Sequence, residues 1–289
     1  MGLAGAGRRA AEVHAVALAE SPEIDFVGVW ARDSAAVEAL ARQHGVRAFA
    51  QFRDLLGNCD AVSFAVPPAA QSELASLAAR LGKSVLLEVP IGWDLDSAED
   101  LTKAVVASGV VSQVAFTWRY TETVRLFLEE LAPLTPPQSA RGRVIRARKE
   151  PPRRTSQWRR ERGLLLDVGP HVVDLLDAAL GSIVEVDAGE DAGGLVKLKL
   201  EHHLRGSSES FLGADPGLDH DRAEFEFFGP DGATLVDCSG AETRADYGAM
   251  FAEFAGAVRT GEAHELDVRR GLHVQRVIEA ADTKLLLGG

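Results

Sequence analysis

The sequence has few cysteines and no long apolar run, and both absences narrow the class of protein. Its 289 residues include only 2 cysteines, Cys59 and Cys238, which stand far apart in the chain. This usage fits a reducing compartment better than a disulfide framework or a zinc site, so we expect both thiols to be packing residues. No stretch approaches the roughly 20 apolar residues that cross a bilayer, and the N-terminus lacks a basic region followed by an apolar one. We therefore expect a cytoplasmic protein that does not bind membranes.

Positive charge is also scarce. Lysine and arginine number 31 against 43 aspartates and glutamates, which gives a formal net charge of -12. This balance argues against a general affinity for nucleic acid or anionic lipid. The hydrophobic fraction of 46% is sufficient for the cores of one large domain or two ordinary ones, so the chain is predicted to be globular.

Short apolar strands alternate with longer helical stretches over the first 115 residues or so. The strands are indicated by DFVGVWA, DAVSFAV and SVLLEV, and the helices by SAAVEALARQHG and QSELASLAARLG. This alternation predicts right-handed βαβ crossovers and a doubly wound parallel sheet. Sheets of this kind bind ligands beyond the carboxyl ends of their strands. We predict an α/β Rossmann domain over residues 1–115.

The pattern changes after about Val114, which predicts a second, α+β domain over residues 116–289. VKLKLE, at 196–201, and AEFEFF, at 223–228, alternate apolar and charged residues, as antiparallel strands with one buried face do. PLTPPQS, at 133–139, is predicted to be a loop inside this domain. Two helices should close the domain, with apolar stripes formed by Met250, Phe254 and Val258 and by Val274, Val277, Ile278, Ala281 and Leu285.

A glycine-rich turn near the N-terminus predicts a dinucleotide site. Gly5, Gly7 and Ala10 fit the pattern G-x-G-x-x-G/A between a strand and a helix. The first glycine permits the tight turn, the second lets the backbone approach a pyrophosphate, and the small third residue lets helix pack on strand. The helix N-terminus adds amide donors and positive potential. The alternative is a glycine-rich turn in another kind of α/β protein, but the βαβ context favours the dinucleotide.

The residues after the second strand favour NADP over NAD. That strand ends VGVWARD, so Ala31 stands where an NAD-binding unit carries an acid for the ribose hydroxyls, and Arg32 follows it. An arginine at this place can bind a 2′-phosphate and stack on adenine, and Arg8 and Arg9 near the phosphates favour NADP slightly. Two alternatives stay open: Asp33 is the acid of an NAD site, or Arg32 and Asp33 are a solvated pair that opens a helix.

The chain resembles the Gfo/Idh/MocA oxidoreductases, named for glucose-fructose oxidoreductase, inositol dehydrogenase and a rhizopine-catabolism protein. The resemblance implies a Rossmann domain followed by an α+β domain whose open, mostly antiparallel sheet covers the nicotinamide and often forms a dimer interface. A homodimer or homotetramer is therefore expected. The likeness rests on GLAGAGRRA, CDAVSFAVPP, GKSVLLEVP, TWRY, WRRERGLLLDVGPHVVDLLDAALG, FFGPDGATL and FAGAVRTGE.

The segment LLEVP resembles the family's E-K-P motif but lacks its lysine. In the family this strand ends at the nicotinamide and the proline is commonly cis, so the resemblance places Glu88, Pro90 and Pro67 of the VPP segment at the cofactor. The family's lysine touches the substrate oxygen and assists proton transfer, whereas Val89 has no donor and no titratable proton. Either the catalytic duty has moved to another residue or the usual hydride chemistry is impaired.

Asp167, His171 and Asp174 are spaced to share one face of a helix. Pro170 is tolerated in the first turn of that helix, with Asp167 as the predicted N-cap. The spacing alone favours a capping aspartate and a packed histidine over a catalytic pair. The resemblance places Asp167 and His171 on the family's D-x-x-x-H pair, which implies that His171 is the acid/base and Asp167 its partner.

Other candidates for the substrate site are weaker, and Asp174, on the same helix face as His171, is one of them. Arg119 and Tyr120, beside Trp118, are as typical of packing between domains as of a pocket. Lys149 is a candidate replacement for the missing ammonium, although a solvated lysine explains it better. The basic run at 153–162 is more typical of a solvated loop than of an anion site. His202 and His203 have no third ligand at a convincing spacing, so we predict no metal.

Two classes of function remain at this stage. The first is an NAD(P)-dependent oxidoreductase that transfers hydride between the nicotinamide and a hydroxyl or carbonyl carbon of a small polar molecule, for which the family implies sugars and polyols. The second is a redox-silent relative, either a sensor or scaffold that binds dinucleotide or metabolite, or an enzyme that retains the cofactor for a non-redox outcome. Val89 is the main support for the second class.

Overall fold

The chain folds into two compact units. The computed structural model describes all residues except 132–136, 148–162, 204–205, 231, 241 and 288–289. Unit 1 comprises Met1–Phe116 and Thr243–Gln275, and unit 2 comprises Thr117–Glu242 and Arg276–Gly289. This division differs from a single boundary near residue 115, because helix α9 (Arg244–Thr260) and the first part of α10 (Val268–Leu286) group with unit 1. The Gln113 side-chain amide donates to the Met250 carbonyl at 3.1 Å, which ties α9 to the end of the unit 1 sheet.

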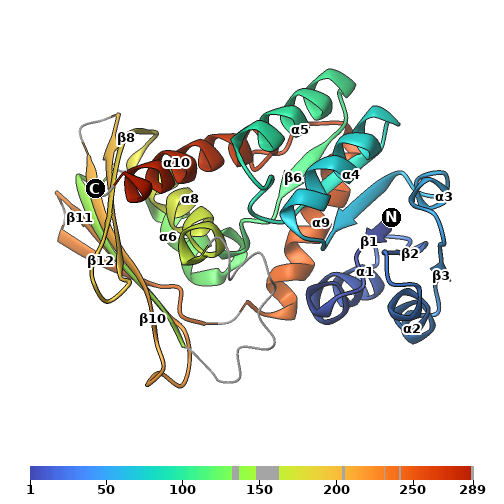
Figure 1. Ribbon diagram of the computed structural model, residues 1–289, viewed down its shortest axis with the longest axis horizontal. Coiled ribbons are helices and arrows are strands. Elements are labelled where there is room, and N and C mark those ends of the chain that lie inside the picture. Colours follow the sequence, from blue (N-terminus) through green and yellow to red (C-terminus); the bar gives the residue numbers. More distant parts are fainter. Residues whose placement is uncertain (132–136, 148–162, 204–205, 231, 241, 288–289) are drawn as a thin grey trace. The chain divides into compact units, whose positions relative to one another are not determined.

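Unit 1 is built on a parallel sheet with the strand order of a dinucleotide-binding fold (Figure 1). In the described part of the chain its six strands run in the order β3-β2-β1-β4-β5-β6. The strands are β1 (Gly2–Ala4), β2 (Gly28–Trp30), β3 (Arg47–Ala48), β4 (Ala61–Phe64), β5 (Ser84–Leu87) and β6 (Ser112–Val114). The helices between them are η1 (Ala10–His14), α1 (Ala15–Glu20), α2 (Ser34–His44), α3 (Phe52–Leu56), α4 (Pro68–Arg80) and α5 (Leu95–Ser108).

The sequence sets these elements through burial and capping. Every residue of β4 and β5 is buried, as expected of central parallel strands covered on both faces. Helix α2 begins where the Asp33 carboxylate accepts from the Ala36 N–H, and it ends at Gly45, whose φ of 67° is left-handed. The predicted boundaries of this helix are therefore confirmed. None of the described helices combines the length and apolarity needed to cross a bilayer.

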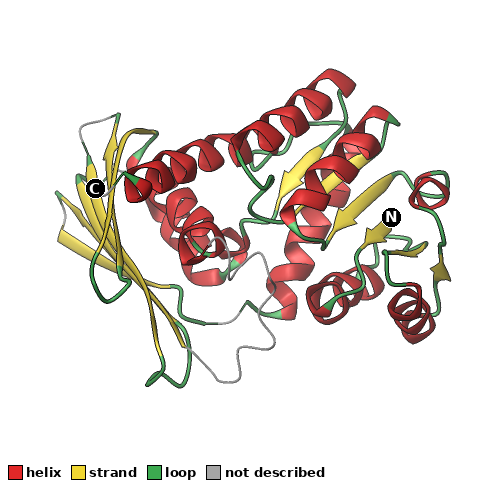
Figure 2. Cartoon of the chain, in the orientation of Figure 1, coloured by secondary structure: helices red, strands yellow, loops and turns green. Residues whose placement is uncertain are grey.

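Unit 2 is a mostly antiparallel sheet with helices against it (Figure 2). Its described strands follow the order β12-β11-β7-β10-β9-β8, with β7 and β10 parallel. The strands are β7 (Ser139–Ala147), β8 (Ile183–Glu190), β9 (Val196–His202), β10 (Ser207–Asp215), β11 (Arg222–Gly229) and β12 (Gly232–Asp237). Its helices include η2 (Thr117–Tyr120), α6 (Glu122–Leu131), α8 (Gly169–Leu180) and the last part of α10. The predicted fold class, a Rossmann sheet followed by an α+β part with an open sheet, is confirmed.

Candidate functional site

The glycine turn between β1 and η1 has the geometry of a phosphate-binding turn. Gly5 has a φ of 135°, and a Cβ added there would lie 2.4 Å from the Ala65 carbonyl oxygen, so the close approach of the two backbones requires glycine. A Cβ at Gly7 would meet nothing within 4 Å, so the exposed backbone is open to a ligand. Ala10 is fully buried where the helix begins. The turn therefore fits the pyrophosphate of a dinucleotide, with Gly5, Gly7 and the helix amides holding it.

The two arginines of the turn differ in what they contact. Arg8 is exposed and pairs with Glu12, one turn along the same helix, at 2.8 Å. Arg9 donates from Nε to Glu88 at 2.9 Å and from Nη1 to the Tyr247 hydroxyl at 2.9 Å. Arg9 thus links the glycine turn to the end of β5 and to α9, all within unit 1.

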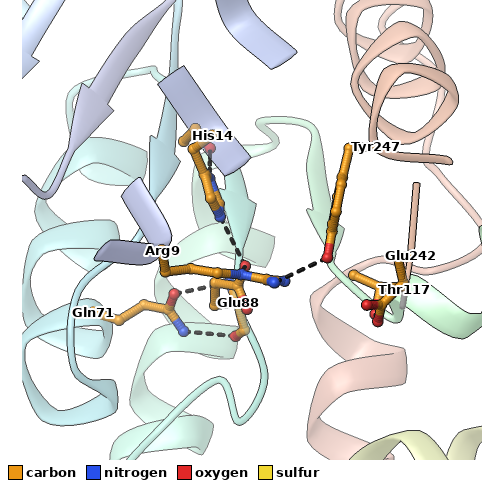
Figure 3. A network of polar contacts seen from close by, with 8 residues as sticks. Arg9, His14, Gln71, Glu88, Thr117, Glu242 and Tyr247 are labelled. Carbon is orange, nitrogen blue, oxygen red and sulfur yellow. Dashed lines mark hydrogen bonds and ion pairs between the residues drawn. The ribbon is translucent and has the colours of Figure 1, made fainter. Parts of the chain in front are cut away.

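A π-helical turn brings a second side chain to the same carboxylate. Residues Ala10–His14 form a π-helix, closed by the Ala15 N–H bond to the Ala10 carbonyl. In an ordinary α-helix, two residues five apart point about 140° away from each other. The wider π-turn reduces this angle, so Arg9 and His14 both reach Oε1 of Glu88 (Figure 3). Such turns are often found at functional sites.

Glu88 is held from several sides inside unit 1. The His14 ring lies 2.7 Å from Glu88 through Nε2 and 2.7 Å from the Ser63 hydroxyl through Nδ1, and both His14 and Ser63 are fully buried. The buried Gln71 amide of α4 accepts from the Glu88 N–H at 2.9 Å and donates to the Glu88 carbonyl at 2.8 Å (Figure 3). Burial opposes ionisation of Glu88, but the charge of Arg9 and the hydrogen bond from His14 outweigh it and hold its pKa well below the ordinary range.

The stability of the protein should therefore respond to acid through Glu88. Its folded-state pKa is lower than the unfolded value of about 4.3, so the stabilisation is present above that pH and is lost as the pH falls towards the folded-state pKa. Between about pH 5 and pH 3, the wild type should lose roughly 2 kcal/mol more unfolding free energy than Glu88→Gln, measured by urea unfolding at each pH. The exposed Glu129, which pairs with Arg125, provides a control, because Glu129→Gln should follow the wild type. Equal losses in Glu88→Gln and wild type would contradict this assignment.

The buried strand β5 ends at a carboxylate and a proline. Glu88 turns from the strand into the network around Arg9 and His14, and the Val89–Pro90 peptide bond that follows is cis. Val89 is only 8% exposed, and the next residues, Pro90 and Ile91, are buried as well. The position of the family's lysine is thus part of an apolar segment in this chain.

The residues predicted to select the cofactor lie just beyond β2 and β4. Arg32 is exposed and makes no hydrogen bond or ion pair with any described residue. The Asp33 carboxylate caps α2 by accepting from the Ala36 N–H. This contact fits the alternative in which Asp33 opens a helix rather than the one in which it binds the ribose of NAD. Pro67 is exposed and precedes α4 as its N-cap residue.

In unit 2, His171 lies in the first turn of α8. The prediction that Asp167 caps this helix is wrong: the N-cap is Val168, and Asp167 is in a separate helical segment at 163–167. The cause is the turn at Val168, which puts Gly169 and Pro170 in the first helical positions and leaves Asp167 outside. His171 is half-buried and its ring lies 5.4 Å from the Trp118 ring, centroid to centroid.

Two of the predicted substrate residues form a buried ion pair. Arg119 of η2 contacts Asp174 of α8 at 3.4 Å, and the carboxylate is almost completely buried. Tyr120, the residue after Arg119, is also buried. Asp174 lies one turn after His171 on α8, and its contact with Arg119 connects η2 to α8.

A cationic residue that the sequence did not single out lies close to Asp167. Arg146, near the end of β7, donates to the Asp221 carboxylate, which also accepts from the Ala147 N–H at 2.7 Å. Burial lowers the pKa of Arg146, but the charge of Asp167, followed by the bond to Asp221, raises it above its ordinary value. Arg146 is therefore a positive charge in unit 2 that interacts electrostatically with Asp167.

Several predicted features lie elsewhere or outside the described residues. Lys149 and the basic run at 153–162 are outside them. His202 is bound to the Gly181 carbonyl at 2.7 Å and to the Ser208 hydroxyl at 3.0 Å, which is a structural role. Across the described residues, no group of three or more His, Cys, Asp or Glu side chains is arranged to hold a metal ion. Cys59 and Cys238 are buried and free, as predicted, and burial raises the pKa of Cys238 to about 12.

The fold and the glycine turn together define a dinucleotide-binding fold. Residues 1–116 match the family model described as "Oxidoreductase family, NAD-binding Rossmann fold" (GFO_IDH_MocA). These residues therefore match the NAD-binding Rossmann part of the Gfo/Idh/MocA oxidoreductases. The resemblance drawn from the sequence is confirmed.

Similar proteins establish the fold of the whole chain. A crystal structure of GenD2 from gentamicin A biosynthesis in complex with NAD is 21% identical, with a TM-score of 0.87 over 100% of this chain and 94% of that chain. A putative myo-inositol dehydrogenase from Sinorhizobium meliloti is 18% identical, with a TM-score of 0.84 over 99% and 97% of the two chains. Among curated proteins, the uncharacterized protein YMR315W of Saccharomyces cerevisiae is 26% identical over 137 residues, which are 45% of this chain and 38% of the yeast protein.

Proposed function

We propose that the protein is an NAD(P)-dependent oxidoreductase that interconverts a hydroxyl and a carbonyl group on a small polar substrate of the sugar or polyol class. The observation that carries the proposal is the glycine turn, since Gly5 requires a glycine and the backbone at Gly7 is open to a phosphate. The substrate class is supported by the similarity to a putative myo-inositol dehydrogenase and to a UDP-N-acetylglucosamine 3-dehydrogenase from Acidithiobacillus ferrooxidans.

The chain's own residues would bind the cofactor and move the proton. When bound, the cofactor supplies the hydride acceptor or donor. The backbone at Gly5 and Gly7 and the N-terminus of η1 hold the phosphates. His171 exchanges the proton of the substrate oxygen, because an imidazole can take or give a proton near neutral pH, and Asp167 assists it. Val89 has no proton to exchange, so the family's lysine has no counterpart at that position.

Selection of NADP over NAD is proposed to depend on Arg32. Its side chain is exposed beyond β2, while the neighbouring Asp33 caps α2 and so is less suited to the ribose hydroxyls. Arg32→Ala should weaken NADPH binding about tenfold and leave NADH binding within twofold, because only NADPH carries the 2′-phosphate. Fluorescence titration of the two nucleotides measures this. The exposed Arg42 of α2 supplies the matched control, and Arg42→Ala should change neither affinity. An equal loss for NADH and NADPH would contradict a phosphate contact.

A substrate screen tests the proposed reaction. Purified protein is mixed with NAD or NADP and a panel of cyclitols, aldoses, sugar nucleotides and polyols, and the absorbance of the reduced nicotinamide is followed. The reverse screen uses NADH or NADPH with the corresponding ketones. Cofactor reduction or oxidation that depends on one class of substrate supports the proposal. Binding of nucleotide without any absorbance change over the panel would contradict it.

A redox-silent protein is the second candidate, and Val89 favours it. The cis-peptide segment that carries the family's lysine is apolar here, so the usual cation is absent from this segment. A silent protein would bind the dinucleotide or a metabolite without turnover, or retain the cofactor for a non-redox reaction. His171→Ala separates the two candidates, because loss of turnover with intact nucleotide binding excludes a silent sensor.

A further inference from the structure

The Arg9–Glu88 ion pair places one charge of each sign on the ligand-binding edge of the unit 1 sheet. Arg9 belongs to the helix that follows the glycine turn, and Glu88 is the first residue after β5. In open α/β sheets a dinucleotide lies beyond the carboxyl ends of the strands, with its pyrophosphate at the first helix N-terminus. The Arg9 side chain is 39% exposed and that of Glu88 is 16% exposed. Both charges therefore lie on the side of the sheet where this cofactor would bind.

Both charges are fixed in place. The Arg9 guanidinium lies over the Tyr247 ring, 5.2 Å from its centroid, and also donates to the Tyr247 hydroxyl. Gln71 holds the backbone of Glu88 on both its N–H and its carbonyl, and His14 holds its carboxylate (Figure 3). Charges that do not reorient act on a ligand more strongly than mobile ones, because no reorganisation opposes them.

The two redox forms of the cofactor respond differently to a fixed charge. The oxidised nicotinamide ring carries one positive charge, whereas the reduced ring is neutral, and the pyrophosphate is the same in both. A carboxylate near the ring favours the oxidised form and a guanidinium disfavours it. Because position 89 holds valine, the positive charge that the structure shows in contact with the Glu88 carboxylate is that of Arg9.

We propose that the Arg9–Glu88 pair sets the relative affinity of the protein for oxidised and reduced nicotinamide dinucleotide. Arg9 offsets the preference for the oxidised cofactor that Glu88 alone would create. This inference rests on the proposed function, because it requires that unit 1 binds a nicotinamide cofactor.

Two single variants test it by moving the ratio of affinities in opposite directions. Arg9→Met removes the positive charge and leaves Glu88 ionised, so the dissociation constant of the oxidised form should fall about 3- to 10-fold relative to that of the reduced form. Glu88→Gln leaves Arg9 uncompensated, so the same ratio should rise by about the same factor. Calorimetric titration with both forms of the better-bound cofactor, at about pH 8.5 to keep Glu88 ionised, gives the ratios. Any loss of pyrophosphate binding affects both forms and cancels.

Two further variants provide controls. Arg8→Met removes the neighbouring charge, which contacts Glu12 rather than Glu88, and should leave the ratio unchanged. The double variant Arg9→Met/Glu88→Gln removes both charges and should return the ratio to within about twofold of the wild type. Thermal melts check folding, and Arg9→Met alone decides the sign if Glu88→Gln does not fold.

The outcomes separate this inference from the proposed function. If the wild type binds both forms but neither single variant changes the ratio, or both change it in one direction, the inference is wrong and the proposed function stands. If the wild type binds neither form, both are wrong. Opposite changes in the two single variants, with an unchanged ratio in Arg8→Met, establish the inference.

Discussion

Replacement of His171 by asparagine is expected to lower turnover by about 10²- to 10⁴-fold while the affinity for NAD(P)H stays within twofold. The reason is that His171 is the residue proposed to exchange the substrate proton, and Val89 cannot substitute for it. Asparagine keeps a polar side chain beside Trp118 but has no titratable proton. The measurement is kcat and KM with the substrate that the screen identifies, together with a fluorescence titration of the cofactor.

The exposed His203 of the same unit provides a matched control for this prediction. The His203 N–H donates to the Ser182 carbonyl, which follows the C-terminal end of α8, so His203→Asn should leave kcat within twofold. A His171→Asn protein with more than half of the wild-type turnover would show that the acid/base is another residue. Equal losses in both variants would indicate a general effect on unit 2.

The second large effect is expected from a pair of glycine substitutions. Gly5→Ala should lower the unfolding free energy by about 2–4 kcal/mol, because the φ of 135° is unfavourable for alanine and its Cβ would lie 2.4 Å from the Ala65 carbonyl oxygen. Gly7→Ala should leave stability within about 0.5 kcal/mol, since the added Cβ meets nothing within 4 Å. Urea unfolding of the two variants measures the difference.

The two glycines should differ in the cofactor assay as well. Gly7→Ala should weaken NAD(P)H binding about tenfold or more without a loss of stability, because its methyl group occupies the open space that the pyrophosphate requires. A Gly7→Ala protein that binds the cofactor as tightly as the wild type would mean that the phosphates do not lie on this turn. Unchanged stability in Gly5→Ala would contradict the close backbone approach seen in the structure.

The fold was predictable because its signals are local and periodic. The apolar runs that became β4 and β5, and the alternation that became β9 and β11, have the burial that their patterns indicate. Gly45 ends α2 as a left-handed residue, which follows from glycine's tolerance of positive φ. Met250 and Phe254, predicted to share one stripe, are fully buried on α9.

The composition of the polar network was not predictable, because it depends on contacts between distant segments. Arg9 meets Glu88 and Tyr247 across 79 and 238 residues of sequence, and no spacing rule joins them. His14 lies among apolar residues in the sequence, so the sequence did not reveal that its ring contacts Ser63 and Glu88. Its position depends on the π-turn at Ala10–His14, which the sequence pattern does not reveal. The cap of α8 was missed because Asp167 is typical of an N-cap, although Val168 and Gly169 form the helix start.

The central claim is that unit 1 binds a nicotinamide dinucleotide on the glycine turn, and direct titration tests it. Purified protein is titrated with NADPH and with NADH, and the change in nicotinamide fluorescence is followed. We expect saturable binding of at least one nucleotide, with NADPH the tighter of the two and with Gly7→Ala weakened. Absence of binding for both nucleotides in the folded wild-type protein would contradict the account, and the glycine turn would then be a structural feature without a cofactor.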